Sequence, residues 1–405
     1  MKYIYIVSAA SAWLTLCGAT LLPYATPDQR GVEVADQLRR NYNDLTTDCG
    51  AVSRPSFLCS GVILRGTVYS DNYRAWDPSP QSTAQGGTSF SYLRKDAKFK
   101  ALASFHKNGY ILYPEFLKPV STMTNVSVLC AFPVDASSHT RLSAGCGDHT
   151  STPQIEDYCQ NLGVTTAGQW NTHYRNNESS HRRACGFNVA ANPQGKGAEA
   201  FIATLRSMKY TEGENFSNAG PNNNELRIAA WSSGLAEQLP IQAFFYLTGG
   251  VEFAKKDQRA FYADGGRFVP VIKLAFPATP GQDATFTYSS ADQASLGDVV
   301  CKRYIDSASW EKRFDPGLNA QAWTLSVIPT DCGRSIGAGQ TEAFYSEMLR
   351  NYGNSAEWKE RDGGGMRRQL VCLISTVRTK DVWNLEPFRP YTTHEKAVAA
   401  GCNNT

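Results

Sequence analysis

The first 280 residues contain short apolar runs separated by polar segments. Apolar runs of four to eight residues bounded by turn residues are typical of buried strands. The pattern predicts six such strands, over residues 62–67, 88–92, 110–113, 126–132, 225–231 and 239–247. A seventh predicted strand, over 268–276, contains Pro270, which lacks a backbone N–H and therefore suits an edge strand.

Other segments have the spacing or the end signals of helices. Val34, Leu38 and Tyr42 recur every four residues and predict an amphipathic helix. Another segment begins at Asp96, a preferred N-cap residue, and stops at Asn108-Gly109, which are typical of a helix end. Helices are therefore predicted over 32–42, 96–107, 198–208 and 254–263.

Changes in composition divide the chain into units. Residues from about 136 to 195 are polar and hold three cysteines, which predicts a disulfide-rich insertion. Pro277–Asp283 has the composition of a domain boundary. We therefore expect an α+β fold, with a mixed β core and flanking helices over 30–280 and a smaller α+β domain over 285–405.

The C-terminal unit, residues 285–405, is expected to have regular structure and a core of its own. Its pattern predicts a helix over 340–351 and a strand with a period of two over 370–377. The unit contains half of the chain's eight tryptophans, namely Trp310, Trp323, Trp358 and Trp383. These indoles are expected in its core, and a sugar-stacking or receptor-binding face is the alternative.

The N-terminus has the pattern of a secretory signal. Lys2 precedes an apolar run from Tyr3 to Leu16, and Cys17-Gly18-Ala19 supplies small residues for cleavage. A spanning anchor is the alternative, because the run is nearly long enough to cross a bilayer. Since no basic cluster follows, we expect a signal peptide over 1–19, a secreted or periplasmic protein and no stable membrane anchor.

The cysteine count supports an oxidising compartment. Removing Cys17 from the eleven cysteines leaves ten, an even number that favours disulfides over a metal site. The absence of Cys-x-x-Cys and the presence of only six histidines weaken a zinc interpretation. Sequence leaves the connectivity open, and one neighbour-pairing hypothesis is Cys49–Cys59, Cys130–Cys146, Cys159–Cys185, Cys332–Cys372 and Cys301–Cys402.

Three side chains on predicted strands are candidates for chemistry. Arg65 ends an apolar run, where an arginine is costly unless it meets a carboxylate or a phosphate. Ser89 and Ser91 alternate on the strand that follows a glycine turn, and Glu225 opens another apolar strand. The net charge of +3 indicates neither a nucleic-acid partner nor an anionic membrane surface.

A cation, a hydroxyl and an acid suit the cleavage of a nicotinamide–ribose bond. The leaving group already carries positive charge, so no general acid is needed, and the transition state resembles an oxocarbenium ion. An arginine can hold phosphate oxygens through two hydrogen bonds. Serine hydroxyls can orient the arginine and the acid, and the carboxylate can oppose the developing positive charge. This chemistry requires NAD as a substrate and no metal.

The order of these motifs resembles a known enzyme class. Leu64-Arg65-Gly66, Thr88-Ser89-Phe90-Ser91 and Asn223-Asn224-Glu225 resemble, in this order, the Arg–Ser–Glu class of ADP-ribosyltransferases, the group of cholera and pertussis toxins. The whole chain resembles the secreted halovibrin-type proteins, described as ADP-ribosyltransferases or NAD glycohydrolases. Its last part resembles a bacterial domain family of unknown function.

The resemblance implies an ADP-ribosyltransferase-like β core and roles for individual residues. Arg65 would bind the phosphate or ribose of NAD, Ser89 would brace the site with Ser91 as its neighbour, and Glu225 would be catalytic. Apart from the resemblance, Trp76 in the polar loop before the second strand is a candidate to stack on adenine or nicotinamide. A toxin or effector that transfers ADP-ribose to water or to a protein acceptor is the implied function.

Two departures bear on the acceptor. Phe90 stands where the family's Ser-Thr-Ser motif has threonine, and Asn223 stands where the family has an upstream Glu or Gln. The upstream residue helps to activate an acceptor in the family. The departure at Asn223 therefore favours hydrolysis of NAD over modification of a protein.

Each candidate also has a structural interpretation. Arg65 could pair with Asp77 or Asp96, and the two serines could form the polar side of an amphipathic strand. Glu225 could be a cap or a surface charge, and Trp76 could anchor its loop. At the level of function, the alternative is a secreted, non-enzymatic binding protein whose C-terminal unit recognises a host or envelope surface. A glycoside hydrolase would need two close carboxylates, and no motif pairs them.

Overall fold

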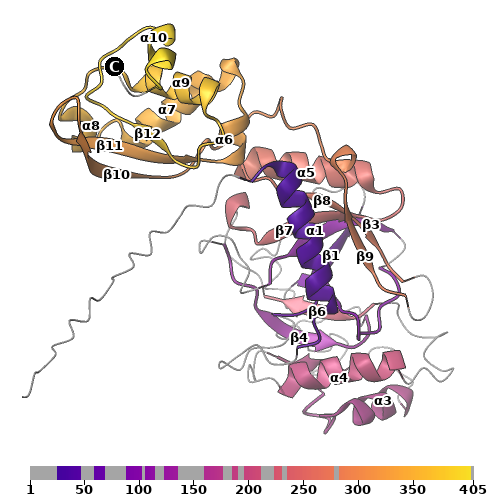
Figure 1. The fold of residues 1–405 in the computed structure, drawn as a ribbon. Coiled ribbons are helices and arrows are strands. Elements are labelled where there is room, and N and C mark those ends of the chain that lie inside the picture. The colour runs from indigo at the N-terminus through magenta and orange to yellow at the C-terminus, as the bar shows by residue number, and fades with distance from the viewer. Residues whose placement is uncertain are drawn as a thin grey trace, which may run out of the picture.

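The computed structural model describes residues 25–46, 59–68, 88–102, 105–114, 123–135, 159–176, 185–189, 196–210, 223–229, 235–277 and 282–402. The predicted signal peptide over 1–19 and Trp76 lie outside the described residues. The described chain is α+β and forms a large N-terminal unit and a smaller C-terminal one (Figure 1). None of its described helices is long and apolar enough to cross a membrane.

The N-terminal unit is built on a nine-stranded sheet in the order β5-β4-β6-β2-β1-β3-β7-β8-β9. The strands are β1 (Val62–Val68), β2 (Thr88–Leu93), β3 (His106–Leu112), β4 (Val128–Phe132), β5 (Phe187–Asn188), β6 (Glu225–Ile228), β7 (Ile241–Tyr246), β8 (Val271–Ala275) and β9 (Thr285–Tyr288). Among the described strands of this sheet, β7 and β8 alone pair in parallel, and helix α5 (Val251–Gly265) connects them. A parallel pair needs such a crossover, because a tight turn cannot join it.

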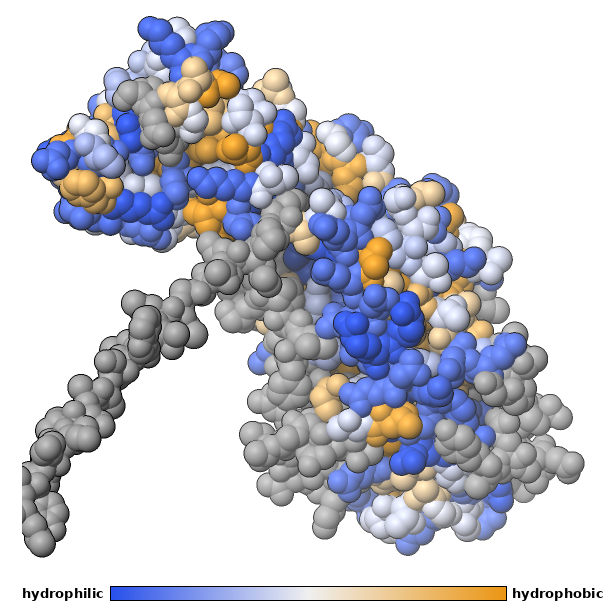
Figure 2. Space-filling view, in the orientation of Figure 1, coloured by the Kyte–Doolittle hydropathy of each residue, from blue (hydrophilic) through white to orange (hydrophobic). Residues whose placement is uncertain are grey.

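Helix α1 (Pro27–Asn43) covers one face of this sheet. Thr26 and Gln29 form a capping box at its start, and proline suits the first helical position. Leu38 and Tyr42 of its inner face pack against Leu64 and other sheet residues. Its outer face carries the charged and amide residues Asp36, Arg39, Arg40 and Asn43, and this side of the molecule is largely hydrophilic (Figure 2).

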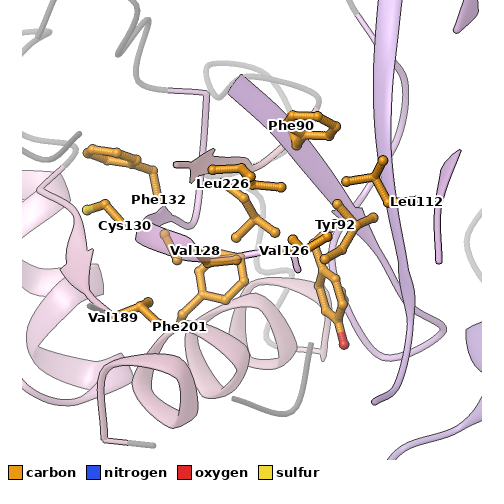
Figure 3. Close-up of a cluster of buried hydrophobic side chains, with 14 of the residues drawn as sticks. Phe90, Tyr92, Leu112, Val126, Val128, Cys130, Phe132, Val189, Phe201 and Leu226 are labelled. Atoms are coloured by element: carbon orange, nitrogen blue, oxygen red, sulfur yellow. The ribbon is translucent and has the colours of Figure 1, made fainter. Parts of the chain in front are cut away.

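The other face is covered by α4 (Lys196–Tyr210) and α5. Phe201 of α4 lies fully buried among side chains of β2, β4 and β6, among them Tyr92, Val128 and Leu226 (Figure 3). Burying one such side chain contributes about 1.5–3 kcal/mol. Helix α3 (Ala167–Asn176), from the predicted insertion, adds Trp170, whose Nε1 donates to the Cys185 carbonyl at 3.1 Å.

The C-terminal unit packs short helices on a three-stranded sheet. The strands are β10 (Ile305–Asp315), β11 (Ala320–Pro329) and β12 (Trp383–Leu385), and they pair in that order. The helices are α6 (Asp331–Ser335), α7 (Thr341–Tyr352), α8 (Ala356–Lys359), α9 (Met366–Thr376) and α10 (His394–Ala399). Trp358 and Trp383 are buried in its core, and Trp310 is partly buried against it.

Two predicted elements are wrong. The described residues of 96–107 contain no helix, and β3 already begins at His106. The Asp96 carboxylate, taken for a cap, instead holds buried Arg94 at 2.6 Å. The predicted strand over 370–377 is helix α9, whose buried Leu370, Leu373 and Ile374 have helical spacing. A short apolar run does not distinguish a strand from a buried helix.

The predicted edge strand and domain boundary also need correction. Strand β8 lies inside the sheet between β7 and β9, and Pro270 precedes its first residue. Because β9 pairs with β8 from Ile272 to Ala275, the predicted boundary at Pro277–Asp283 falls between two paired strands. The N-terminal unit therefore extends beyond residue 280 to at least the end of β9.

Three disulfides join described cysteines. The predicted Cys159–Cys185 bond is confirmed. The predicted Cys332–Cys372 and Cys301–Cys402 pairs are wrong, because the bonds are Cys301–Cys332 and Cys372–Cys402. Packing of α9 against α10 brings Cys372 and Cys402 together. Cys59 and Cys130 are also disulfide-bonded, and their predicted partners Cys49 and Cys146 lie outside the described residues.

A charged contact joins the two units. Arg30 of α1 donates to both carboxylate oxygens of Asp331, the first residue of α6, at 2.8 and 2.7 Å. Asp331 also accepts from the backbone N–H of Phe268 at 2.6 Å. The two charged side chains are only 27% and 13% exposed, so water screens the pair weakly.

We expect Arg30→Ala to lower the free energy of unfolding by about 1–3 kcal/mol, because it leaves Asp331 partly buried without its cation. Arg39→Ala is the matched control, since Arg39 pairs with Asp36 on the surface at 56% and 44% exposure and such pairs contribute about 0–1 kcal/mol. Urea unfolding followed by tryptophan fluorescence measures both. Equal losses in the two variants would show that the contact contributes no more than a surface pair.

Candidate active site

The three predicted strands are neighbours in the sheet, in the order β6-β2-β1. Ser89 of β2 is the register partner of Arg227 of β6. Glu225 opens β6, and Arg65 lies near the middle of β1. The fold therefore brings Arg65, Ser89 and Glu225 into one region, although they are widely separated in sequence.

Strands β1 and β2 pair over only part of their length. The ladder joins Val62–Leu64 to Ser91–Leu93, whereas β1 continues along β3 to Val68. Beyond the ladder, the guanidinium of Arg65 donates from Nη1 to the backbone carbonyl of Ser89. Its carbon Cζ also lies 5.6 Å from the centre of the Phe90 ring. Arg65 therefore leaves β1 on the Phe90 face, opposite to Ser89 and Glu225, and its guanidinium meets the Ser89 backbone where the strand pairing ends.

The Ser89 hydroxyl links two charged residues of β6. Arg227 donates from Nη1 to Ser89 Oγ at 2.7 Å, and Ser89 Oγ donates to Oε1 of Glu225. A guanidinium has no acceptor, so the single hydroxyl proton of Ser89 must point to the carboxylate. The direction of this hydrogen bond is thus set by Arg227.

Glu225 and Arg227 are buried, at 4% and 1% exposure. Residues two apart on a strand point to the same face, and Arg227 Nη1 lies 3.9 Å from Glu225 Oε1. A buried carboxylate is costly unless it is paired and hydrogen-bonded. Arg227 and Ser89 together meet that requirement and hold Glu225 in one position.

The electrostatics of Arg65 follow from its surroundings. Burial lowers its pKa, and Tyr110 and Glu225 oppose that shift. An arginine nevertheless stays charged at any physiological pH. The site therefore contains a permanent cation, Arg65, that interacts electrostatically with the carboxylate of Glu225. Both lie near the point where the backbones of β1 and β2 separate.

A polar scaffold holds the start of β6. The Asn224 side chain accepts from the backbone N–H of Tyr92 and donates to its carbonyl, both at 2.8 Å. The amide thus acts as one more rung beyond the β2–β6 ladder, which ends at Phe90 and Leu226. Ser91 Oγ donates to the Asn224 carbonyl at 3.1 Å. The hydroxyl of Ser91 is therefore used to position the residue before Glu225, and its contact with NAD stays a prediction.

His106 lies over Gly66 at a bulge in β3, within the electrostatic influence of Arg65. The register between β1 and β3 shifts after Thr67, and His106 becomes the partner of Val68. A Cβ on Gly66 would lie 2.8–2.9 Å from atoms of His106, so only glycine leaves room for this side chain. Burial and the charge of Arg65 lower the pKa of His106 to about 4. The imidazole is therefore neutral near pH 7.

Some expected interactions can be placed and others cannot. Asp96, the structural alternative partner for Arg65, is held by Arg94 and Arg206 instead. Asp77 and Trp76 lie outside the described residues. Within the described residues, no group of three or more His, Cys, Asp or Glu side chains is arranged to hold a metal ion.

Sequence reasoning missed three residues of this region. Arg227 follows Glu225 by two positions, and this Glu-x-Arg alternation on a strand was the available signal. Asn224 gave no signal, because its role depends on the backbone of another strand. His106 falls within the predicted helix over 96–107, and nothing in the sequence indicates the β3 bulge that places its ring over Gly66.

Comparisons with known proteins identify relatives without a described activity. Residues 305–405 match a family described as a protein of unknown function, DUF2599. Uncharacterized proteins of Mycobacterium bovis and of two Mycobacterium tuberculosis strains are 34% identical to the chain over 88 residues, 20% of this chain and 55% of each relative. The chain thus spans about half the length of these curated relatives. No solved structure matches it.

We expect Asn224→Ala to lower the free energy of unfolding by about 2–4 kcal/mol, because two buried backbone groups of Tyr92 lose their partners. Asn354→Ala is the matched control, since Asn354 is exposed on a turn and such changes stay within about 0.5 kcal/mol. Chemical denaturation followed by circular dichroism measures both. A loss for Asn224→Ala as small as the control's would contradict the scaffold role.

The depressed pKa of His106 predicts a pH effect. The unfolded chain takes up this proton near pH 6.5 and the folded chain near pH 4, so His106 reduces stability as the pH falls through that interval. Arg65→Gln should raise the pKa of His106 by removing a nearby cation. Histidine titration by NMR measures it, with Arg39→Gln on α1 as the control. An unchanged pKa in the Arg65 variant would contradict this origin of the shift.

Proposed function

We propose that the chain is a secreted enzyme that cleaves NAD and releases nicotinamide. The observation that carries this proposal is the hydrogen-bonded set around Ser89. Its hydroxyl orients Glu225, and its carbonyl binds the Arg65 guanidinium. Ser89 thereby holds the Glu225 carboxylate and the Arg65 guanidinium in a fixed arrangement. A dinucleotide substrate needs both groups, the acid for its reactive ribose and the cation for its pyrophosphate.

The proposed reaction breaks the bond between C1′ of the ribose and the nitrogen of nicotinamide. The bonding electrons leave with nicotinamide, which departs neutral, and the ribose becomes oxocarbenium-like. The carboxylate of Glu225 opposes that positive charge and accepts a hydrogen bond from a ribose hydroxyl. Water then adds to C1′ and releases a proton to the solvent. No general acid and no metal are needed for these steps.

Arg65 is proposed to bind the pyrophosphate. Arginine binds phosphate oxygens through a planar set of donors. One nitrogen of Arg65 is held by the Ser89 carbonyl, which orients the planar guanidinium before substrate binds. A positioned cation loses less conformational freedom on binding than a mobile one.

Hydrolysis is favoured over transfer to a protein. Asn223 occupies the position where the resembled toxin class has an acceptor-activating Glu or Gln. Its side-chain nitrogen donates to the Asn224 carbonyl at 3.3 Å, and an amide is not a base at neutral pH. Water is therefore the proposed acceptor, and a protein acceptor is the less favoured alternative.

The fold and the disulfides support the cellular context of the proposal. We infer that the nine-stranded unit is an ADP-ribosyltransferase-like core of the halovibrin type. The disulfides favour an oxidising compartment and agree with the secretory pattern over residues 1–19. A toxin or effector is the corresponding class of protein.

A second candidate function is surface recognition by the C-terminal unit. Its sheet carries an open hollow of about 520 Å³ lined by residues that include Ser307, Ser309, Ser326 and Asn384. The charged residues Glu311, Arg313, Lys380 and Asp381 also line it, and such a polar surface suits a polar partner such as a host or envelope glycan. Surface recognition by the C-terminal unit can accompany the proposed NAD cleavage. It becomes the proposed function of the protein if the full chain releases no nicotinamide.

We expect Glu225→Gln to lower nicotinamide release by about 100- to 1,000-fold, the usual effect of removing a group that stabilises transition-state charge. The smaller change Ser89→Ala should lower release less, because the carboxylate remains. Glu252→Gln is the matched control, since the Glu252 side chain is 76% exposed on α5. Nicotinamide is measured with the purified full-length protein and millimolar NAD. Equal rates for the wild type and Glu225→Gln would reject the assignment.

A further inference from the structure

An exposed aromatic side chain lies beside the candidate site. Phe105, immediately before β3, is 54% exposed. Its ring centre lies 4.3 Å from that of His106, and the two rings meet edge to face. Large aromatic side chains usually bury most of their surface, so an exposed one held against a second ring suits contact with a ligand.

The strand register places His106 on the same face of the sheet as the acid. Register partners on antiparallel strands direct their side chains to one face. Leu64 is the partner of Ser91, and His106 is the partner of Val68, four residues further along β1. Since residues two apart on a strand share a face, His106 lies on the face that carries Ser89 and Glu225.

The contact with Gly66 fixes the position of the His106 ring along β1. The imidazole lies directly over Gly66, where even a Cβ would not fit. Gly66 follows Arg65 and, by extension of the β1–β2 register, faces Ser89 across the point where the strands separate. The His106 ring thus borders the separation of β1 and β2 from the face that carries Ser89 and Glu225. Arg65 leaves β1 on the opposite face, beside Phe90, and its guanidinium reaches the same separation to bind the Ser89 carbonyl.

The chemistry of His106 suits a nucleotide. Its imidazole is neutral near pH 7, so it does not repel the adjacent guanidinium or exclude a cationic nicotinamide ring. Its Nδ1 is buried and makes no hydrogen bond to any part of the chain that the structure describes. That atom lies against Gly66, so a ligand would meet the other ring nitrogen, Nε2.

We propose that Phe105 and His106 form the base-binding side of the site. Phe105 stacks on an aromatic base of the dinucleotide, and His106 hydrogen-bonds the sugar or phosphate next to Arg65. This inference rests on the proposed function, because it takes a nucleotide as the ligand. It goes further by assigning specificity for the base to residues outside the Arg65, Ser89 and Glu225 set.

Binding of ADP-ribose to the full-length protein, measured by calorimetry, tests the inference. Phe105→Ala should weaken binding about 10-fold, within the range that stacking of one base on an aromatic ring supports. Phe105→Trp should bind within about 2-fold of wild type, because it keeps an aromatic surface. Phe314→Ala is the matched control, since Phe314 is 57% exposed in the C-terminal unit. Ribose 5-phosphate, which has no base, should bind Phe105→Ala and wild type equally.

The inference is overturned if Phe105→Ala binds ADP-ribose as Phe314→Ala does, or if the wild type does not bind it. An equal loss for ribose 5-phosphate would also overturn it, because stacking cannot act on a ligand without a base. Nicotinamide release by wild type and Glu225→Gln separates the two claims. Glu225-dependent release with no effect of Phe105→Ala removes this inference alone. Phe105-dependent binding without NAD turnover removes only the enzymatic proposal.

Discussion

Ser89 is the residue on which the candidate site depends, because it uses both of its oxygens. The hydroxyl accepts from Arg227 and donates to Glu225, and the carbonyl accepts from Arg65. These contacts join side chains of β1, β2 and β6 where the backbone ladder between β1 and β2 has ended. The Arg65 and Glu225 side chains therefore keep a fixed relation without continuous strand pairing. Such preorganisation is what a charge-stabilising site needs, because no protein dipole has to turn during the reaction.

The surrounding fold explains why this arrangement can persist. Packed helices cover both faces of the sheet, and Asn224 extends the pairing of β2 with β6 by one side-chain rung. The buried Glu225 and Arg227 would be costly apart, but together with Ser89 they satisfy one another. The C-terminal unit is fastened to α1 through Arg30 and Asp331, at the opposite end of the helix from the residues that pack on β1.

The sequence could predict the features that a local residue pattern indicates. Arg65, Ser89 and Glu225 could be singled out as candidates because each places an ionic or hydroxylic side chain in an apolar strand, and the structure makes their strands neighbours. Arg227 and His106 were missed because their roles depend on register and on a bulge, which no local pattern encodes. Asp96 has the sequence signature of a helix cap, but its carboxylate binds Arg94 instead of the N-terminus of a helix. Disulfide pairing in the C-terminal unit depends on helix packing, and neighbour pairing therefore misassigned it.

A structure of the Glu225→Gln protein with bound NAD tests the central claim most directly. The account predicts the nicotinamide ribose within hydrogen-bond distance of position 225 and the pyrophosphate on the Arg65 guanidinium, with the Arg227–Ser89 hydrogen bond intact. NAD bound at another place, or a guanidinium of Arg65 that contacts no part of the dinucleotide, would contradict it.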